Sequence, residues 1–288
     1  MAATAPKLSC DCHMHVFGPR ARFPLVAGRA YTPAEAPIED YRASHRPLGL
    51  ERVVLVQASV YGSDNRCMLE AIARLGERAR GVAVIDPGAS EAELSALHRG
   101  GVRGIRLNLA THGKTSREQA ADAIRHAARQ VAPLGWHLQL YLEPAILAGL
   151  AELIADLELP VVVDHMGRPE AAAGVGQPGF AALLELIATG RVWVKLAGAD
   201  RIANSNEQFA AVAPFAKALI ARRPDRLVWG SDWPHIGWHS RATVRDEEVL
   251  PFRTLDEARL LGLLDDWSPD ASVRERILVA NPADLYGF

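Results

Sequence analysis

Residues 8–16 read LSCDCHMHV, an apolar run that ends in the pair His13 and His15. Side chains two residues apart on a β-strand point to the same side, because side chains alternate across the pleat. Two later apolar runs end in similarly reactive residues, His165 after VVVD and Asp232 after LVWGS. Three imidazoles and one carboxylate at the ends of separate strands can meet at one point. The first run therefore predicts both a parallel-strand fold and a reactive site.

Eight apolar runs of strand length recur along the chain, separated by longer amphipathic segments. Several are continuously apolar, which is typical of parallel strands buried on both faces. The expected strands cover residues 8–16, 52–59, 81–86, 102–109, 136–143, 159–166, 192–198 and 227–232. Eight strands alternating with helices predict an α/β fold, a (β/α)8 TIM barrel that spans residues 1–288 as a single domain.

The segments between the strands predict helices and two long loops. Helical spacing is clearest over residues 144–158, and Pro144 suits the first helical position. Further helices are expected to begin near Ser63, Ser90, Ser116, Pro178 and Asn206, several with a Ser or Asn that can act as N-cap. Residues 18–37 are expected to form a long loop, and residues 233–272 to be irregular. Loops at the C-terminal face of a barrel are where substrates are held.

Composition excludes several partners. The 288 residues carry a net charge of −2, so no basic surface indicates nucleic acid. There is no long uninterrupted apolar stretch that indicates a membrane span, and the N-terminus lacks the pattern of a secretory signal. Three cysteines are too few for a disulfide framework and favour a reducing compartment. We therefore expect a cytoplasmic protein that binds neither nucleic acid nor membrane, while the oligomeric state stays open.

Other histidines and cysteines are expected to have structural roles. Cys10 and Cys12 alternate out of phase with His13 and His15, so they are interpreted as small buried hydrophobes that face away from the imidazoles. His45 lies in a helical pattern and is expected to face solvent.

Cationic and hydroxyl side chains also follow the expected strands. Arg106, Arg168 and Arg201 lie near strand ends, and Tyr31, Ser59 and Tyr141 add hydroxyl groups. Guanidinium groups bind carboxylates through paired hydrogen bonds, so three arginines at one mouth predict a small anionic ligand. The alternative is that each arginine pairs with a surface acid.

A metal site is the main alternative to a metal-free hydrolytic site. Imidazole and carboxylate suit zinc or manganese, and His13, His15, His165 and Asp232 could hold one divalent ion. A binuclear centre would need ligands from the middle strands, where the candidates are Arg106, Tyr141 and Lys195; Lys195 is on the wrong strand for a carbamylated bridge. A site with three arginines repels a metal ion. No cofactor is therefore expected, with one zinc or manganese ion as the alternative.

Six motifs occur in order along the chain. They are DCHMHVFGP at 11–19, QAS at 57–59, GSDN at 62–65, GIRLN at 104–108, DHMGRP at 164–169 and WGSDWPH at 229–235. Together they resemble the amidohydrolase superfamily, and within it the branch of 2-pyrone-4,6-dicarboxylate lactonases. The resemblance runs over nearly the whole chain.

The resemblance implies a metal-independent lactone hydrolase of aromatic-compound degradation. It implies that Asp232 is the general base that activates water, and that His13, His15 and His165 polarise the lactone carbonyl. It assigns the substrate's carboxylates to Tyr31, Ser59, Arg106, Tyr141, Arg168 and Arg201. Where the family has one more arginine, this chain has His112, with Lys114 and Arg117 nearby. The alternatives are a sugar-acid lactonase of the same branch, a mononuclear-metal decarboxylase or hydrolase, and a non-catalytic anion-binding protein.

Overall fold

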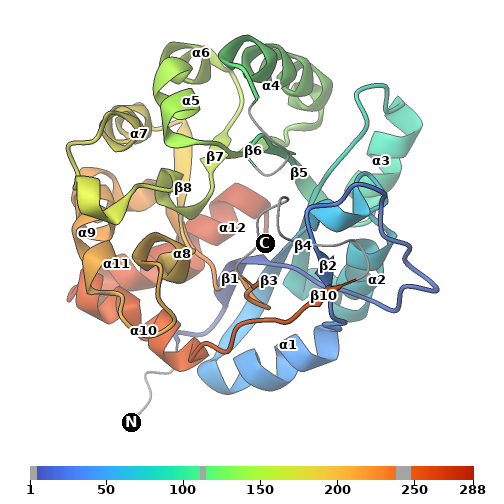
Figure 1. The fold of residues 1–288 in the computed structure, drawn as a ribbon, viewed down its shortest axis with the longest axis horizontal. Coiled ribbons are helices and arrows are strands. Elements are labelled where there is room, and N and C mark those ends of the chain that lie inside the picture. The colour runs from blue at the N-terminus through green and yellow to red at the C-terminus, as the bar shows by residue number, and fades with distance from the viewer. Residues whose placement is uncertain (1–4, 111–114, 238–247) are drawn as a thin grey trace.

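Eight parallel strands form the predicted barrel in a computed structural model that describes residues 5–110, 115–237 and 248–288 (Figure 1). Their order is β1-β3-β4-β5-β6-β7-β8-β9. The bounds are β1 (Ser9–Met14), β3 (Leu50–Val56), β4 (Ala79–Ala83), β5 (Val102–Asn108), β6 (His137–Tyr141), β7 (Val161–Val163), β8 (Val192–Leu196) and β9 (Leu227–Trp229). The end of β1 meets the segment after β9, where the Asp232 amide donates to His13 O at 2.8 Å and the His15 amide donates to Trp233 O at 2.9 Å. All eight expected strands are confirmed, with bounds shifted by a few residues.

The barrel has two apolar cores, one outside the ring of strands and one inside it. The larger core lies between the sheet and the helices and includes Leu55 and Leu140. The smaller core contains Cys10, Cys12, Val54 and other strand residues together with Tyr286 of the last helix, so it fills the barrel interior. Cys10 and Cys12 are fully buried, as predicted. An irregularity in the pairing of β1 between Asp11 and Met14 interrupts the simple alternation assumed from the sequence.

Most of the helices pack around the ring of strands, while α12 lies across the middle of the ring in this view (Figure 1). They are α1 (Ile38–His45), α2 (Arg66–Leu75), α3 (Glu91–Arg99), α4 (Arg117–Val131), α5 (Pro144–Gly149), α6 (Ala151–Asp156), α7 (Pro178–Ala188), α8 (Ala199–Ala203), α9 (Ala213–Arg222), α10 (Glu257–Trp267), α11 (Ala271–Glu275) and α12 (Asn281–Tyr286). Ser90 and Ser116 both form capping boxes, with Glu93 and Gln119. The helix expected over residues 144–158 is instead two helices, because the backbone leaves the helical region at Leu150; Gly149, a poor helix former, precedes the break.

The two long segments contain more regular structure than expected. Within residues 18–37, β2 (Thr32–Pro33) pairs in parallel with β10 (Val249–Leu250), a pairing too short to leave a sequence pattern. The expectation that residues 233–272 are irregular is wrong for α10. Asp256 caps this helix, accepting from the Arg259 amide at 3.0 Å, and its leucines and Trp267 are buried. Among the described helices, none has the length and apolar character that crossing a membrane requires.

Candidate active site

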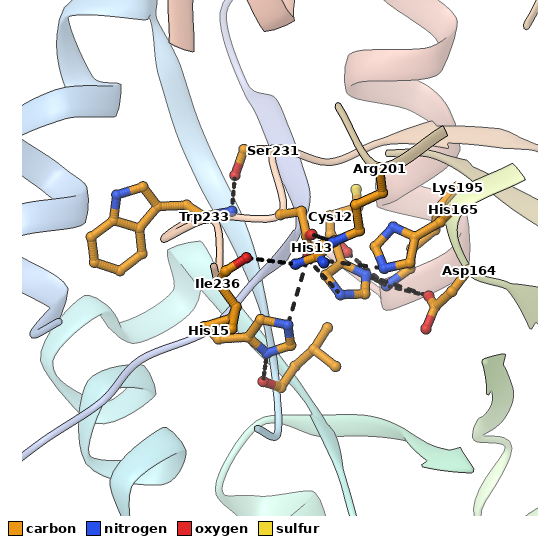
Figure 2. Close-up of polar contacts among 12 residues, drawn as sticks. Cys12, His13, His15, Asp164, His165, Lys195, Arg201, Ser231, Trp233 and Ile236 are labelled. Carbon is orange, nitrogen blue, oxygen red and sulfur yellow. Dashed lines mark hydrogen bonds and ion pairs between the residues drawn. The ribbon is translucent and has the colours of Figure 1, made fainter. Parts of the chain in front are cut away.

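The four predicted reactive residues converge on one carboxylate oxygen at the C-terminal mouth of the barrel. Asp232 Oδ1 lies 3.7 Å from His13 Nε2, 3.7 Å from His15 Nε2 and 3.9 Å from His165 Nε2. All four side chains are nearly inaccessible to solvent. Figure 2 shows the His13, His15 and His165 rings gathered together. We call these four residues the catalytic cluster.

Unusual backbone conformations bring these side chains inward. His165 and Asp232, which follow β7 and β9, have φ values of 49° and 65°, a region that costs a non-glycine residue about 1 kcal/mol or more. Two glycines leave room for the rings. A Cβ at Gly198 would lie 2.8 Å from His165 Nδ1, and one at Gly230 would lie 2.6 Å from His13 Cβ. The strand ends are therefore shaped to hold the imidazoles in place.

Asp232 is ionised and held by Arg201. Arg201 Nε donates to Asp232 Oδ2 at 2.8 Å, which leaves Oδ1 facing the imidazoles. Burial alone would raise the pKa of Asp232, but Arg201 and the neighbouring histidines hold it well below its usual range. The carboxylate is consequently a weak base that stays charged at neutral pH.

Burial favours the neutral form of two of the imidazoles, those of His13 and His165. Burial, reinforced by the Lys195 ammonium, holds the pKa of His13 well below its usual range despite Asp164. Burial likewise lowers the pKa of His165 to about 4, against the opposing charge of Asp232. His15 Nδ1 lies 2.8 Å from Val56 O, and because a carbonyl only accepts, Nδ1 carries the proton there. This hydrogen bond fixes the His15 ring with Nε2 facing Asp232 Oδ1.

A second layer of buried polar residues lies under His13, and Arg106 alone among them was predicted to be a site residue. Asp164 Oδ1 is 3.3 Å from His13 Nδ1, while its Oδ2 accepts from Arg106 Nε at 2.9 Å and from Gln139 Nε2 at 3.1 Å. Burial would raise the pKa of Asp164, but Arg106, His13 and Lys195 hold it well below its usual range. Lys195 is fully buried, which lowers its pKa to about 8. In the sequence, the sign of this layer is a charged or amide residue inside an otherwise apolar strand.

Each of the three predicted ligand-binding arginines has an acidic partner. Arg201 pairs with Asp232 and Arg106 with Asp164, both inside the site. Arg168 pairs with Glu143 at 2.6 Å, near the surface. The guanidiniums of Arg106 and Arg168 lie 4.8 and 4.7 Å from the centre of the Tyr141 ring, which brings these predicted residues together. The alternative of surface pairing therefore fits Arg168 alone.

The remaining predicted residues lie along the same mouth or outside the described chain. Burial raises the pKa of Tyr31 to about 12, opposed by its hydrogen bond with Ser59 and by the charges of Arg201 and Arg106. Tyr31 is thus within electrostatic reach of both arginines, and Ser59 joins the site through it. His112 lies outside the described residues.

The comparisons with known proteins identify the family. The amidohydrolase family profile matches residues 10–288. The chain belongs to the amidohydrolase family. A 4-sulfomuconolactone hydrolase of Rhizobium radiobacter is 41% identical over 98% of this chain and 91% of its own length. A 2-pyrone-4,6-dicarboxylate hydrolase of Comamonas testosteroni is 36% identical over 98% of this chain and 90% of its own length.

A solved structure agrees with these relatives. A probable 2-pyrone-4,6-dicarboxylic acid hydrolase of Acinetobacter baumannii, with citric acid bound, is 26% identical, covers 98% of this chain and 100% of its own, and has a TM-score of 0.80. The predicted enzyme class, a lactone hydrolase of the amidohydrolase superfamily, is confirmed by these similarities.

The donor set of this amidohydrolase fits one divalent cation. His13, His15 and Asp232 form one group of close ligand atoms, and His13, Asp164 and His165 form another. A zinc ion with ligands at about 2.0–2.2 Å can lie between atoms 3.7–3.9 Å apart. Such an ion would polarise a carbonyl or a bound water. His13, His15 and Asp232 would hold it, and Arg201 would have to share Asp232 with it; in the described chain the predicted fourth ligand, His165, belongs to the other group.

A neighbouring group of buried acids and imidazoles holds the Asp232 loop of this amidohydrolase from outside. His235 Nε2 lies 2.7 Å from Glu257 Oε1, and His45 Nε2 lies 3.3 Å from Glu257 Oε2. Ser231 Oγ donates to Asp11 Oδ2 at 2.5 Å. We call Asp11, His45, Ser231, His235 and Glu257 the bracing cluster. The expectation that His45 faces solvent is wrong: it is fully buried, because α10 covers it with Glu257.

Proposed function

We propose that this amidohydrolase opens an anionic, conjugated lactone of the pyrone or muconolactone type with water activated by Asp232. The observation that carries the proposal is the convergence of three imidazole Nε2 atoms on Asp232 Oδ1, within 3.7–3.9 Å. This spacing is too long for direct hydrogen bonds, so a water molecule or a carbonyl oxygen can take up the hydrogen bonds that these groups do not make with one another.

The charge of the site favours an anionic substrate. Arg106, Lys195 and Arg201 outnumber Asp164 and Asp232 by one positive charge when the imidazoles are neutral. Arg106 pairs with Asp164 and Arg201 with Asp232 through Nε, so the outer nitrogens of each guanidinium are not part of these pairs. The relatives support the same substrate class, since one acts on a sulfonated muconolactone and another on a pyrone dicarboxylate. We infer a lactone of aromatic-compound degradation with one or two acidic groups.

The reaction moves one proton from water to Asp232 and then from Asp232 to the leaving oxygen. Water attacks the lactone carbonyl carbon while Asp232 Oδ1 takes one of its protons. The carbonyl oxygen becomes an oxyanion, which N–H groups of His13 and His165 stabilise. The carbonyl re-forms as the ring C–O bond breaks, and the departing enolate oxygen takes the proton from Asp232. The product is the ring-opened acid.

His15 takes a different part from the one that the resemblance implies. Its Nδ1 proton is engaged with Val56 O, which fixes the ring with Nε2 beside Asp232 Oδ1. We assign it to orienting the attacking water beside Asp232.

The weakness of Asp232 as a base restricts the substrate. Arg201 keeps the pKa of this carboxylate low, so it removes little of the water's proton on its own. The carbonyl must therefore be strongly electrophilic and the leaving group stable. A conjugated lactone that releases an enolate satisfies both requirements, and an ordinary amide satisfies neither.

We further propose that the reaction needs no metal and that the protein is cytoplasmic. Supporting the first is the Arg201–Asp232 contact, which gives the carboxylate a cation other than a metal ion. Supporting the second are the three free and buried cysteines, which suit a reducing compartment.

A substrate panel with metal analysis tests the proposal. Purified enzyme is assayed against 2-pyrone-4,6-dicarboxylate, 4-sulfomuconolactone, muconolactone and several aldonolactones, before and after exhaustive chelation. We expect turnover of the conjugated anionic lactones, unchanged by chelation and with metal content far below one per chain. A preference for aldonolactones would support a sugar-acid lactonase. Activity lost on chelation and restored by zinc or manganese would overturn the metal-free mechanism.

A further inference from the structure

Lys195 is a buried cation directly beneath His13. It projects from β8 with no solvent exposure, and its Nζ donates to Cys12 O at 2.8 Å and to Gln139 Oε1 at 2.7 Å. A third contact joins Nζ to His13 Nδ1 at 3.3 Å (Figure 2). An ammonium has three hydrogens, and two are therefore already committed to backbone and amide oxygens.

The neighbours of Lys195 are fixed in orientation by their own contacts. Gln139 accepts from Lys195 through Oε1, so its Nε2 donates to Asp164 Oδ2 at 3.1 Å. Arg106 Nε donates to the same oxygen at 2.9 Å. Asp164 Oδ1 then faces His13 Nδ1 at 3.3 Å and Lys195 Nζ at 3.8 Å.

His13 Nδ1 thus lies between a donor and an acceptor, and a neutral ring can satisfy only one of them. If Nδ1 carries the proton, it donates to Asp164 and a bare Nε2 points at Asp232. If Nδ1 is bare, it accepts from Lys195, and an N–H at Nε2 points at Asp232 and the pocket. In the described part of the chain, His13 Nε2 has no hydrogen-bond partner of its own. The choice between the two tautomers therefore decides what His13 offers to a ligand.

We propose that Lys195 is a positioning residue that donates its third hydrogen to His13 Nδ1 and so keeps the proton of His13 on Nε2. The nearest acceptor for this hydrogen is Nδ1, at 3.3 Å, whereas Asp164 Oδ1 is 3.8 Å away. Asp164 already accepts two hydrogen bonds at Oδ2. Asp164 Oδ1 has no hydrogen-bond partner among the described residues, so in this tautomer the Lys195 ammonium, 3.8 Å away, balances its charge.

This assignment deepens the proposed function and rests on it for its catalytic meaning. An Nε2–H on His13 is the donor that a lactone oxyanion needs, and a bare Nε2 is the donor atom that zinc needs. With Nδ1–H directed at Asp164, His13 would have the carboxylate–histidine arrangement common at zinc sites. Lys195 therefore biases the same four side chains toward oxyanion binding and away from metal binding.

Nitrogen NMR of the imidazole rings tests the tautomer directly in the full-length wild-type protein. With ¹⁵N-labelled histidine, and His13 assigned by comparison with His13→Gln, we expect a protonated Nε2 and an unprotonated Nδ1. In Lys195→Met the two should exchange roles, while in Lys217→Met, an exposed lysine on α9, they should not. A protonated Nδ1 in the wild-type protein would overturn the proposal whether or not Lys195→Met folds.

Kinetics and zinc binding give the functional consequence. Loss of one oxyanion donor costs about 10²–10³-fold in kcat, so we expect about 10²-fold or more in Lys195→Met with KM little changed, because Lys195 does not touch substrate. Zinc affinity, measured by calorimetry on chelated protein, should rise at least about tenfold. Unchanged kcat and zinc affinity in a folded variant would refute the role. If the wild-type protein opens no lactone, the proposed function fails, while the NMR result still decides the tautomer.

Discussion

The catalytic and bracing clusters are built from the same groups, acids and imidazoles buried at the same end of the barrel, yet they differ in spacing. In the bracing cluster, Glu257 lies 2.7 Å from His235 and Asp11 lies 2.5 Å from Ser231. In the catalytic cluster, Asp232 Oδ1 stays 3.7–3.9 Å from each of three imidazoles. In the first arrangement the members contact one another directly, and in the second the groups are farther apart than a hydrogen bond allows.

The difference indicates how the barrel separates stability from chemistry. Paired buried groups stabilise a fold because removing one partner leaves the other unsatisfied. Groups held apart gain little from each other and can respond to a ligand. The bracing cluster fixes the loop that carries Asp232, and the catalytic cluster uses that rigidity. Substitutions in the two clusters should therefore affect different quantities.

The largest expected effect is on catalysis, from Asp232→Asn. An amide cannot take the proton from water, so we expect kcat to fall by at least about 10³-fold, as for other removed catalytic groups. The midpoint of thermal unfolding should fall as well, since Asn keeps the shape of the side chain but leaves Arg201 without its carboxylate partner. Stopped assays and thermal unfolding on the same samples measure both. Activity near the wild-type level would support the anion-binding alternative instead.

Glu257→Gln should have the converse effect, on stability. Burial would raise the pKa of Glu257, but His235 and His45 lower it to about 2, which corresponds to at most about 3 kcal/mol of stabilisation. The variant should lose much of this free energy of unfolding while retaining far more activity than Asp232→Asn. A large loss of kcat with unchanged stability would remove the distinction between the clusters.

The pH dependence of stability sharpens the same comparison. A depressed folded pKa for Glu257 means that its contribution is complete above the unfolded value of 4.5 and is lost as pH falls toward about 2. The pKa of His235 is raised, chiefly by Glu257 against the effect of burial, so its contribution is complete below 6.5 and fades as pH rises through the raised value. The wild-type and Glu257→Gln proteins should therefore differ most between about pH 5 and 6.5. Urea unfolding at pH 3.5, 6 and 8.5 measures this window, and a pH-independent difference would contradict it.

A smaller loss of activity is expected from Gly198→Ala, which removes none of the reactive groups. A Cβ would approach His165 Nδ1 to 2.8 Å at a φ of 69°, so the ring has to move. Displacing a catalytic group by about 1 Å can cost up to about 10²-fold in rate, and we expect about 10–10²-fold in kcat. Gly176, where a Cβ would meet nothing within 4 Å, provides the control as Gly176→Ala. Equal effects of the two substitutions would show that the close approach is unimportant.

The sequence predicted the barrel and the catalytic cluster for one physical reason. Parallel strands buried on both faces leave continuous apolar runs, and the reactive residues follow directly where those runs end. The bracing cluster leaves no comparable pattern, because His45 and Glu257 are 212 positions apart and meet only when α10 folds over α1. Lys195 and Gln139 were visible as polar residues in apolar strands, but the contact of Lys195 with His13 depends on the irregular pairing of β1. Local patterns thus identify strand ends, while contacts between distant elements need the folded chain.

The smallest expected effect is on substrate binding, from Tyr31→Phe. The Tyr31 hydroxyl is buried, hydrogen-bonds Ser59 and lies within electrostatic reach of Arg106 and Arg201, so it can donate to an acidic group of the substrate. Losing one hydrogen bond of about 1 kcal/mol should raise KM by roughly five- to tenfold with little change in kcat, because the bond forms equally in the ground and transition states. Ser59→Ala is the matched control, since it removes the partner and leaves the tyrosine hydroxyl. A fall in kcat as large as that of Gly198→Ala would place Tyr31 among the reacting groups and enlarge the catalytic cluster by one member.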